Sequence, residues 1–466
     1  MKIIDFAYII EYADTMKKTL FWYPTSFRLT ATVCLLFLLA TALIPQDALR
    51  DNVANSAEYF HEATLFDNVV GDLENSKIDN YADCISTGIA WHFGEGEKYT
   101  AVISADYNLR PEENVNDSFY REMQGEEVAT ENYSRYWHGS AGVIRFLLLF
   151  ADIEAIRYAV ATVGLFLNIV LVITLMRRKQ VVLGVAYTLA FLLINGIFAL
   201  TCLEYAFIFL LMPVATMFLV TNGKMAKKEN VQTAFMVIGM LTAFLDFLTA
   251  ETLTFTVPFV IYYVTVCGSK NQSEAKQVRR RSDWIFLLKS GMAWCAGYAG
   301  MFLTKWGLSA LVLGKDAFRA SADMALERIS GDVSLTSIST GEKANLGQRL
   351  QGIMQRNLGC LYWSKRDVKA GTIALITLIV ILVSFTFWYM ARKAKYEYDK
   401  AALLGVVALV PYLRFLVLSN HTFIHYFFTY RALLVTVMVL FYLIYESTFL
   451  SNLKGEKWRK KNAGKS

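Results

Sequence analysis

The sequence predicts an all-α polytopic membrane protein with about ten transmembrane helices, and two observations support this fold class. Of the 466 residues, 55% are hydrophobic and only 18% are charged, and the mean hydropathy is +0.37. Stretches of roughly 18 or more mostly apolar residues recur along the chain, and each is long enough to cross a bilayer as a helix. We therefore expect one helical bundle with its loops and not several soluble domains.

The predicted organisation has three parts. Residues 1–26 are mixed and aromatic, with no compact apolar core and no small-residue cleavage site, which indicates a retained amphipathic cytoplasmic segment and not a signal peptide. Residues 27–449 form the transmembrane bundle with its loops, and residues 450–466 form a basic cytoplasmic tail. By hydropathy, we expect spans at residues 27–45, 154–175, 181–199, 203–221, 231–249, 252–267, 288–313, 370–390, 401–418 and 431–449.

Lysine and arginine are concentrated in a few segments between or after the predicted spans. These segments are MRRKQ, NGKMAKKEN, GSKNQSEAKQVRRRSD, ARKAKYEYDK and KGEKWRKKNAGKS. With ten spans, all of them and both termini lie on one side, and the positive-inside rule assigns that side to the cytoplasm. We expect a bacterial cell membrane, with a eukaryotic reticulum membrane as the alternative.

Two long loops, residues 46–153 and 315–369, are then expected on the outer side. From Gln46 to Gly139 the first loop holds 19 acidic and 6 basic residues, although the whole chain has a net charge of +6. The loop ends in an apolar segment at 140–151 that is too short to span, which predicts a helix in the membrane interface. We expect the loop to pack on the bundle as an ordered cap that contacts the turn at 419–431.

Several polar residues near the outer ends of spans need an explanation, because a charge at mid-depth costs about 2.5–3.5 kcal/mol on insertion scales. One interpretation is that each side chain reaches the nearby interface alone. We favour a shared cationic pocket, since these residues lie at one depth and all five histidines lie outside. Such a pocket suits a phosphate or pyrophosphate head on a long lipid. The predicted substrate-binding residues are His138, Arg145, Asp246, Lys305, Arg414, His421, His425 and Arg431.

A second candidate site is the stretch KIDNYADCISTGIAWHF in the first outer loop. Asp79 and Asp83 are four residues apart, so they share one face of a helix. Two carboxylates outside the membrane could act as a general base for an acceptor hydroxyl, or could bind a divalent cation. The alternative for Asp79 is a structural role as the N-cap of the helix that follows, because Asp is a preferred N-cap residue.

The six cysteines are widely spaced and form no metal-binding pattern. We expect four of them to be small hydrophobic residues in or beside apolar segments, namely Cys34, Cys202, Cys267 and Cys295. Cys84 and Cys360 lie on the outer side, so a disulfide between them is one alternative. The other alternative is that Cys84 is buried beneath Asp79 and Asp83 without a disulfide.

Two stretches resemble membrane glycosyltransferases of the GT-C superfamily. IDNYADCISTGIA resembles the acidic start of their first outer loop, and FADIEAIRYAVATVGLF resembles the start of their second span, at Phe150, Ala155, Arg157 and Gly164. The order of one span, a large outer loop, an interfacial helix and a bundle is also similar. The usual Pro-Pro-Leu before the interfacial helix is replaced by HGSAGVIRF. The resemblance implies that Asp79 is the catalytic base in an inverting transfer from a polyprenyl-phosphate sugar.

The sequence thus favours a glycosyltransferase that acts on the outer face and transfers a sugar to a cell-surface glycan or a lipid-linked acceptor. The cytoplasmic segments contain no Gly-rich phosphate loop, which fits a lipid-linked donor. The alternatives are a lipid-linked oligosaccharide flippase or another transporter, and an O-antigen ligase or polymerase. We found no internal repeat, which weighs against a secondary transporter. The expected partners are the donor, the acceptor and membrane lipids, without nucleic acid, and the only cofactor considered is a divalent cation.

Overall fold

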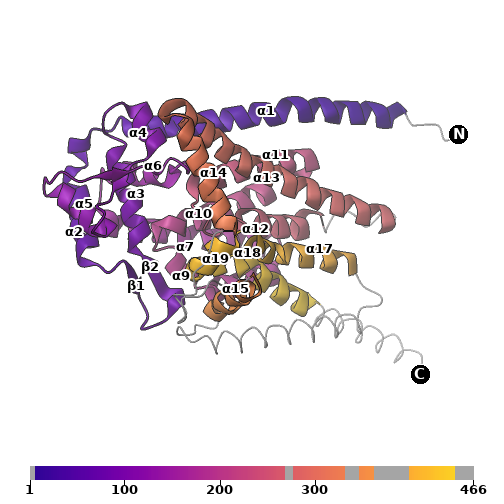
Figure 1. Cartoon of the computed structure of the whole chain (residues 1–466). Helices are drawn as coiled ribbons and strands as arrows, with labels where there is room; N and C mark the ends of the chain where they lie inside the picture. Colours follow the sequence, from indigo (N-terminus) through magenta and orange to yellow (C-terminus); the bar gives the residue numbers. More distant parts are fainter. Residues whose placement is uncertain (1–5, 268–275, 331–345, 362–397, 447–466) are drawn as a thin grey trace, which may run out of the picture.

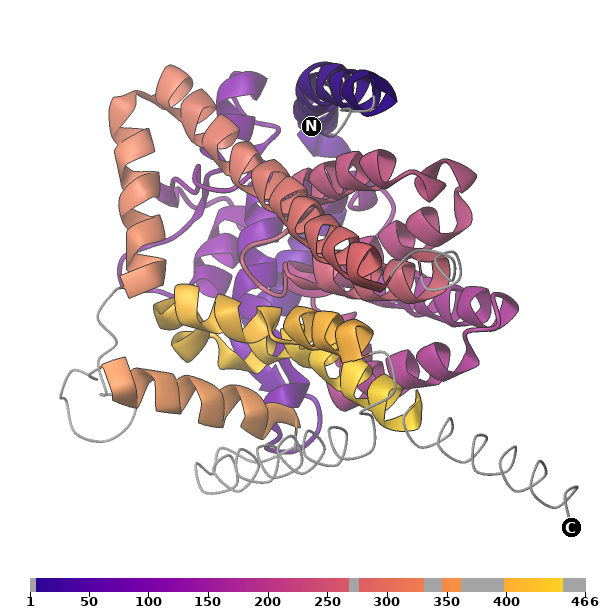
Figure 2. The same cartoon turned by 90° about the vertical axis from the view of Figure 1, so that its right-hand side faces the viewer.

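The computed structural model describes residues 6–267, 276–330, 346–361 and 398–446. It consists of a helical bundle with a smaller cap at one end of the helices (Figure 1). The view along the bundle shows the helices packed side by side (Figure 2). The predicted span at 370–390 and the predicted tail at 450–466 lie outside the described residues.

The cap is formed by short helices and two small antiparallel ribbons. In chain order it contains η1 (Gln46–Ala48), α2 (Arg50–Glu62), β1 (Phe66–Asn68), η2 (Glu74–Ser76), β2 (Lys77–Asp79), α3 (Asn80–His92), α4 (Lys98–Ser104), β3 (Tyr107–Asn108), α5 (Val115–Met123), β4 (Thr130–Glu131) and α6 (Gly139–Leu147). Strand β1 pairs with β2, with Phe66 opposite Asp79, and β3 pairs with β4.

The bundle is all-helical within the described residues. It contains α1 (Phe6–Ala42), α7 (Ile153–Arg177), α8 (Val181–Leu193), α9 (Gly196–Ala199), α10 (Leu203–Thr221), η3 (Gly223–Ala226), α11 (Lys228–Leu245), α12 (Leu253–Tyr262), the π-helix η4 (Tyr263–Cys267), α13 (Lys276–Leu313), α14 (Lys315–Ser330), α15 (Leu346–Leu361), α17 (Tyr398–Ala408), α18 (Val410–Val417), α19 (Ser419–Ile424), α20 (Tyr426–Thr429) and η6 (Tyr430–Leu433).

The described chain contains five helices, not ten, that are long and apolar enough to cross a membrane. They are Tyr23–Ala42, Ile153–Arg177, Leu203–Thr221, Asp399–Val417 and Tyr426–Glu446. Helix α7 exposes large apolar side chains, and Phe166 is 63% exposed, as a lipid-facing helix requires. These five helices indicate a multi-pass membrane protein.

The other predicted spans in the described residues do not coincide with a single long apolar helix. The span at 181–199 is divided into α8 and α9, because Asn195 adopts a left-handed conformation with φ of 58°. Asparagine is one of the few residues that adopts this conformation readily. The span at 231–249 ends at Asp246, and α12 has only 10 residues before the π-helix begins. The span at 288–313 is part of α13, which has 38 residues.

The cap packs on the bundle as predicted and does not have a separate core. One hydrophobic cluster joins residues of α2, α3 and α5 to residues of α1, α7 and α10. The cap also contacts the 419–431 turn: the Tyr426 hydroxyl donates a hydrogen bond to Glu74 at 3.0 Å, and Phe66 packs edge-on against Phe427. Cys84 and Cys360 are both buried free thiols, so the disulfide alternative is wrong.

Helices α11 and α13 approach each other closely through two glycines. A Cβ atom at Gly239 would collide with the carbonyl oxygen of Trp294, and a Cβ atom at Gly297 would collide with that of Met236. Because both obstacles are backbone atoms, no side-chain rotation can relieve the collision. The crossing of these helices therefore depends on the absence of a side chain at Gly239 and Gly297.

We predict that Gly297→Ala lowers the free energy of unfolding by about 1–3 kcal/mol, the usual cost of overpacking. Gly307→Ala on the same helix is the control, because nothing lies within 4 Å of the added Cβ. Alanine is favoured over glycine inside a helix by roughly 0.5–1 kcal/mol, so the control should be neutral or stabilising. Thermal unfolding of the purified variants measures the difference. Equal melting temperatures for the two variants would contradict the close crossing.

Candidate functional site

The acidic stretch predicted from the sequence lies at the junction of cap and bundle. Asp79 ends β2 and is the N-cap of α3, and its Oδ1 accepts a hydrogen bond from the backbone N–H of Ala82 at 2.9 Å. The side chain is buried. The capping alternative is therefore confirmed, and this hydrogen bond occupies only part of the carboxyl group.

Asp83 is fully buried, and its contacts are structural. Its Oδ2 lies 2.7 Å from Nη2 of Arg157 on α7 and accepts the backbone N–H of Leu203 at 3.1 Å. Its Oδ1 accepts the backbone N–H of Glu204 at 2.8 Å. Asp83 thus neutralises Arg157 and also caps the first turn of α10, where backbone N–H groups have no partner within the helix. Because both oxygens are occupied, the predicted catalytic or metal-binding role of Asp83 does not fit these contacts.

Glu204 was not among the residues predicted from the sequence. It lies in the first turn of α10 and is buried. Its carboxyl group is hydrogen-bonded to that of Asp79. Burial raises the pKa of Asp79 to about 7, and the charge of Asp83 adds to the rise, whereas the Ala82 N–H, Glu204 and Arg157 oppose it. A lone acidic residue at the start of an apolar helix was the only available signal for Glu204.

Arg145 on α6 is fully buried and binds the C-terminal ends of two helices. Its guanidinium donates to the carbonyl oxygens of Thr41 at 2.9 Å in the last turn of α1 and of Ile44 at 2.6 Å just after it. It also donates to those of Ala90 at 2.5 Å and Trp91 at 3.1 Å in α3. Carbonyls at a helix C-terminus lack partners within the helix and carry partial negative charge. Arg145 is therefore a structural residue, and the prediction that it binds substrate does not fit its contacts.

Lys305 on α13 has a similar role. Its ammonium donates to the carbonyl oxygens of Val102 at 3.2 Å and Ile103 at 2.8 Å, near the C-terminal end of α4. The side chain is fully buried beside Trp137. It thus attaches the cap to α13, and it does not share a phosphate-binding wall with Arg431.

Arg431 contacts the cap at a different place. Its guanidinium donates to the carbonyl oxygens of Phe427 at 3.2 Å and Asn75 at 3.3 Å. It also lies 4.7 Å from the ring centroid of Tyr205 on α10, a favourable cation–π distance. The cation joins the C-terminal segment to the cap and to α10.

Other predicted residues do come together around Arg414. Arg414 forms a buried ion pair with Glu251 at 2.9 Å and lies 3.5 Å from Nδ1 of His421. The ring of His421 lies 4.6 Å from that of His425. Burial lowers the pKa of His425 to about 3, with Arg328 and Arg414 adding to the effect, and the pKa of His421 is also well below its usual range, mainly through burial. Both imidazoles are therefore neutral, so they add no positive charge to the predicted cationic pocket.

Asp246 lies next to this group, within electrostatic reach of Glu251 and Arg414, and His138 packs against the neighbouring Phe247. Asp246 is buried, and its carboxylate accepts the backbone N–H of Thr249 at 3.1 Å. The ring of His138 lies 5.1 Å from that of Phe247, and its Nε2 bonds the carbonyl oxygen of Tyr133 at 2.8 Å. Burial lowers the pKa of His138 to about 3.

Two arginines that the sequence analysis did not select lie near Tyr136. Burial raises the pKa of Tyr136 to about 12, the neighbouring Tyr133 adds to this rise, and Arg328 and Arg135 oppose it. Tyr81 lies two residues after Asp79 in the chain. Burial, Tyr133 and Asp79 raise its pKa while Arg135 lowers it, so Tyr81 is within electrostatic reach of both Asp79 and Arg135. The acidic group and these arginines thus border one region between cap and bundle.

Polar atoms in this region lack a hydrogen-bond partner within the described part of the chain. They are Glu204 Oε2, His138 Nδ1, Tyr298 OH, Arg135 Nε and Arg328 Nε. Buried polar atoms in proteins are nearly always hydrogen-bonded, so a group of exceptions calls for an explanation. These atoms are hydrogen-bond donors and acceptors that no residue of the described chain satisfies.

The described residues also include one group that could hold a metal ion, formed by His92, Glu95 and Glu122 in the cap. Nδ1 of His92 lies 2.8 Å from Glu95, and Nε2 lies 3.3 Å from Glu122. Burial lowers the pKa of His92, but hydrogen bonds to both carboxylates raise it to about 10. The two ring nitrogens of His92 point in different directions, one toward each carboxylate. The group is therefore a positively charged imidazolium held between Glu95 and Glu122. At the acidic site, a divalent cation would need Asp79 and Glu204, since Asp83 is occupied.

The fold and the site define a multi-pass helical membrane protein with two buried acidic residues, Asp79 and Glu204, between its cap and its helices. Comparisons with protein-family models, with curated proteins and with solved structures find no match to this chain. We therefore infer its function from the chemistry of the site.

We predict that Asp83→Asn lowers the free energy of unfolding by about 3–5 kcal/mol, because it leaves Arg157 buried without a counter-charge. The control is Asp47→Asn, which removes a pair with Arg50 at 3.9 Å in which the Asp47 side chain is 94% exposed. An exposed pair contributes at most about 1 kcal/mol, so the control should be close to wild type. Denaturant unfolding in detergent measures both. A loss for Asp83→Asn no larger than for the control would contradict the structural role.

Proposed function

We propose that the protein is a glycosyltransferase that transfers a sugar from a polyprenyl-phosphate donor between its cap and its membrane helices. The observation that carries this proposal is the buried carboxyl group of Asp79, in contact with Glu204 and with a pKa of about 7. A general base is most effective when its pKa lies near the working pH. An ordinary Asp, with a pKa of about 3.9, would be a much weaker base.

The proposed donor site differs from the one predicted from the sequence. Lys305 and Arg431 already bind carbonyl groups, and Arg414 is neutralised by Glu251. Arg135 and Arg328 each retain an unpartnered Nε–H, so we assign the donor phosphate to these two guanidinium groups. Arginine binds phosphate oxygens through two parallel hydrogen bonds, which also fixes the orientation of the phosphate.

The proposed reaction is a single displacement at the anomeric carbon. Asp79 accepts the proton of the acceptor hydroxyl as its oxygen forms the new bond to the sugar. The bond from the sugar to the phosphate oxygen breaks, and the polyprenyl phosphate leaves with the electron pair and a negative charge that Arg135 and Arg328 neutralise. Attack on the side opposite the leaving group inverts the configuration of the sugar.

One observation favours a second candidate, a proton-coupled transporter of a lipid-linked sugar. Glu204 belongs to a candidate membrane span, and its carboxyl group is hydrogen-bonded to that of Asp79. Buried carboxyl groups on membrane helices commonly mark proton pathways in pumps and transporters. Proteoliposomes with a labelled polyprenyl-phosphate sugar distinguish the candidates: transfer or hydrolysis of the sugar indicates the enzyme, and movement without chemistry indicates the transporter.

We predict that Asp79→Asn lowers kcat at least about 100-fold, since a positioned base contributes typically 10²–10⁴-fold. Its melting temperature should change little, because Asn caps a helix about as well as Asp. In the wild type, the base is active only when deprotonated, so kcat should rise with pH through about 7 and then level off. The assay measures sugar transfer in proteoliposomes across this pH range.

The matched control is Asp152→Asn. Asp152 is the N-cap of α7 and accepts the backbone N–H of Ala155 at 3.0 Å, so it has the same capping role away from the acidic pair. This variant should keep nearly full activity. Turnover of Asp79→Asn near the wild-type level would show that Asp79 is only a cap.

A further inference from the structure

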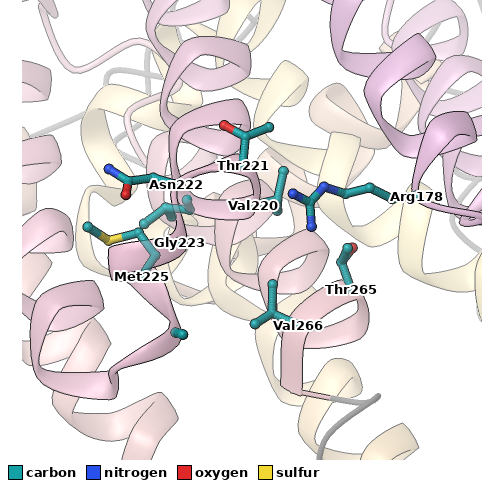
Figure 3. A pocket seen from close by; sticks show the side chains of 10 residues that line it. Arg178, Val220, Thr221, Asn222, Gly223, Met225, Thr265 and Val266 are labelled. Carbon is teal, nitrogen blue, oxygen red and sulfur yellow. The ribbon is translucent and has the colours of Figure 1, made fainter.

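A pocket of about 240 Å³ lies where α7 and α10 end, at the opposite end of these helices from the cap. Figure 3 shows the pocket from close by. Helix α10 begins at the cap, where Asp83 binds its first turn, and its last residues form part of the pocket wall. The end of α7, η3 and the π-helix η4 complete the wall. The lining residues are Arg178, Leu219, Val220, Thr221, Asn222, Gly223, Met225, Ala226, Thr265 and Val266.

The pocket combines an apolar wall with one cation and one free hydroxyl. The guanidinium of Arg178 points into the pocket toward Val220 and Thr265 (Figure 3). Within the described chain, no carboxylate forms an ion pair with Arg178. The Thr265 hydroxyl is buried and has no hydrogen-bond partner there either. The pocket therefore offers an unneutralised cation and an available hydroxyl side by side.

The position of the pocket matches the head-group layer of a bilayer. It lies at the ends of two candidate spans, Ile153–Arg177 and Leu203–Thr221. The segments next to these ends, at 177–179 and 224–228, are rich in Lys and Arg, as is typical of a cytoplasmic surface. The C-terminal ends of α7 and α10 each carry about half a negative charge. The full positive charges of Arg178 and the neighbouring cations are larger, so these helix ends do not neutralise them.

We propose that this pocket binds the phosphate of an anionic glycerophospholipid from the adjoining leaflet. Arg178 and the Thr265 hydroxyl donate to the phosphate oxygens, and the apolar wall contacts the glycerol and the start of the acyl chains. Basic pockets between membrane helices on the cytoplasmic side bind anionic head groups in this way. The site is independent of the glycosyltransferase site, which lies at the other end of α10.

The test uses full-length protein purified in neutral detergent and titrated with phosphatidylglycerol in mixed micelles. Binding is followed by native mass spectrometry and by the shift of the melting temperature. Phosphatidylcholine and inorganic phosphate are titrated in parallel. Three variants are compared with the wild type: Arg178→Gln, Thr265→Val and Arg177→Gln. Arg177 is the matched control, because it is the neighbouring exposed cation and does not line the pocket.

We expect Arg178→Gln to weaken phosphatidylglycerol binding by about tenfold or more, because it removes hydrogen bonds to a charged group. Arg177→Gln should weaken it by no more than about fivefold, the effect of one basic residue near an anionic surface. Thr265→Val should weaken lipid binding without lowering the melting temperature of the lipid-free protein, since the Thr265 hydroxyl has no hydrogen-bond partner among the described residues. Equal binding of phosphatidylcholine or of inorganic phosphate, or equal losses for Arg177→Gln and Arg178→Gln, would overturn the proposal.

Discussion

The buried carboxylate of Asp83 is the contact on which the arrangement of the site depends. It holds three helices together, because it belongs to α3, pairs with Arg157 on α7 and binds the first backbone N–H groups of α10. A buried charge is tolerated only when it is paired and its hydrogen bonds are satisfied, and these three partners satisfy Asp83. Asp83 lies one helical turn after Asp79, so its bond to the backbone N–H of Glu204 brings the Glu204 side chain close to Asp79. The contact between Asp79 and Glu204 is thus a consequence of the way these three helices are joined.

The same principle explains why so many buried cations bind no acidic partner. A helix leaves its last carbonyl groups without partners, and at a buried helix end these groups need donors. Arg145 supplies them for α1 and α3, and Lys305 supplies them for α4. The cap is therefore attached to the bundle through charged side chains on carbonyl oxygens as well as through its apolar core. Arg135 and Arg328 form no ion pair with a carboxylate in the described part of the chain, and each keeps a buried Nε–H without a hydrogen-bond partner there.

The sequence was sufficient for the features that depend on local patterns. Helical composition, the cap on the bundle, the N-cap role of Asp79 and the contact of the cap with the 419–431 turn could all be predicted. The number of spans could not, because hydropathy does not register the left-handed turn at Asn195 or the polar end of α11. The neutral state of His421 and His425 could not be predicted either, since it depends on burial that a sequence does not show. Glu204 and Arg328 join the site only through contacts between distant segments.

The most direct test of the central claim is infrared spectroscopy of the carboxyl groups in purified protein. Protonated carboxyl groups give a C=O stretch that is separate from the carboxylate bands, and buried groups are distinguished by slow exchange with deuterated water. With a pKa of about 7 for Asp79, part of this signal should disappear as the pH rises through 7, and Asp79→Asn should lack the titrating part. A wild-type signal that does not change in this range, or one that Asp79→Asn retains in full, would contradict the account.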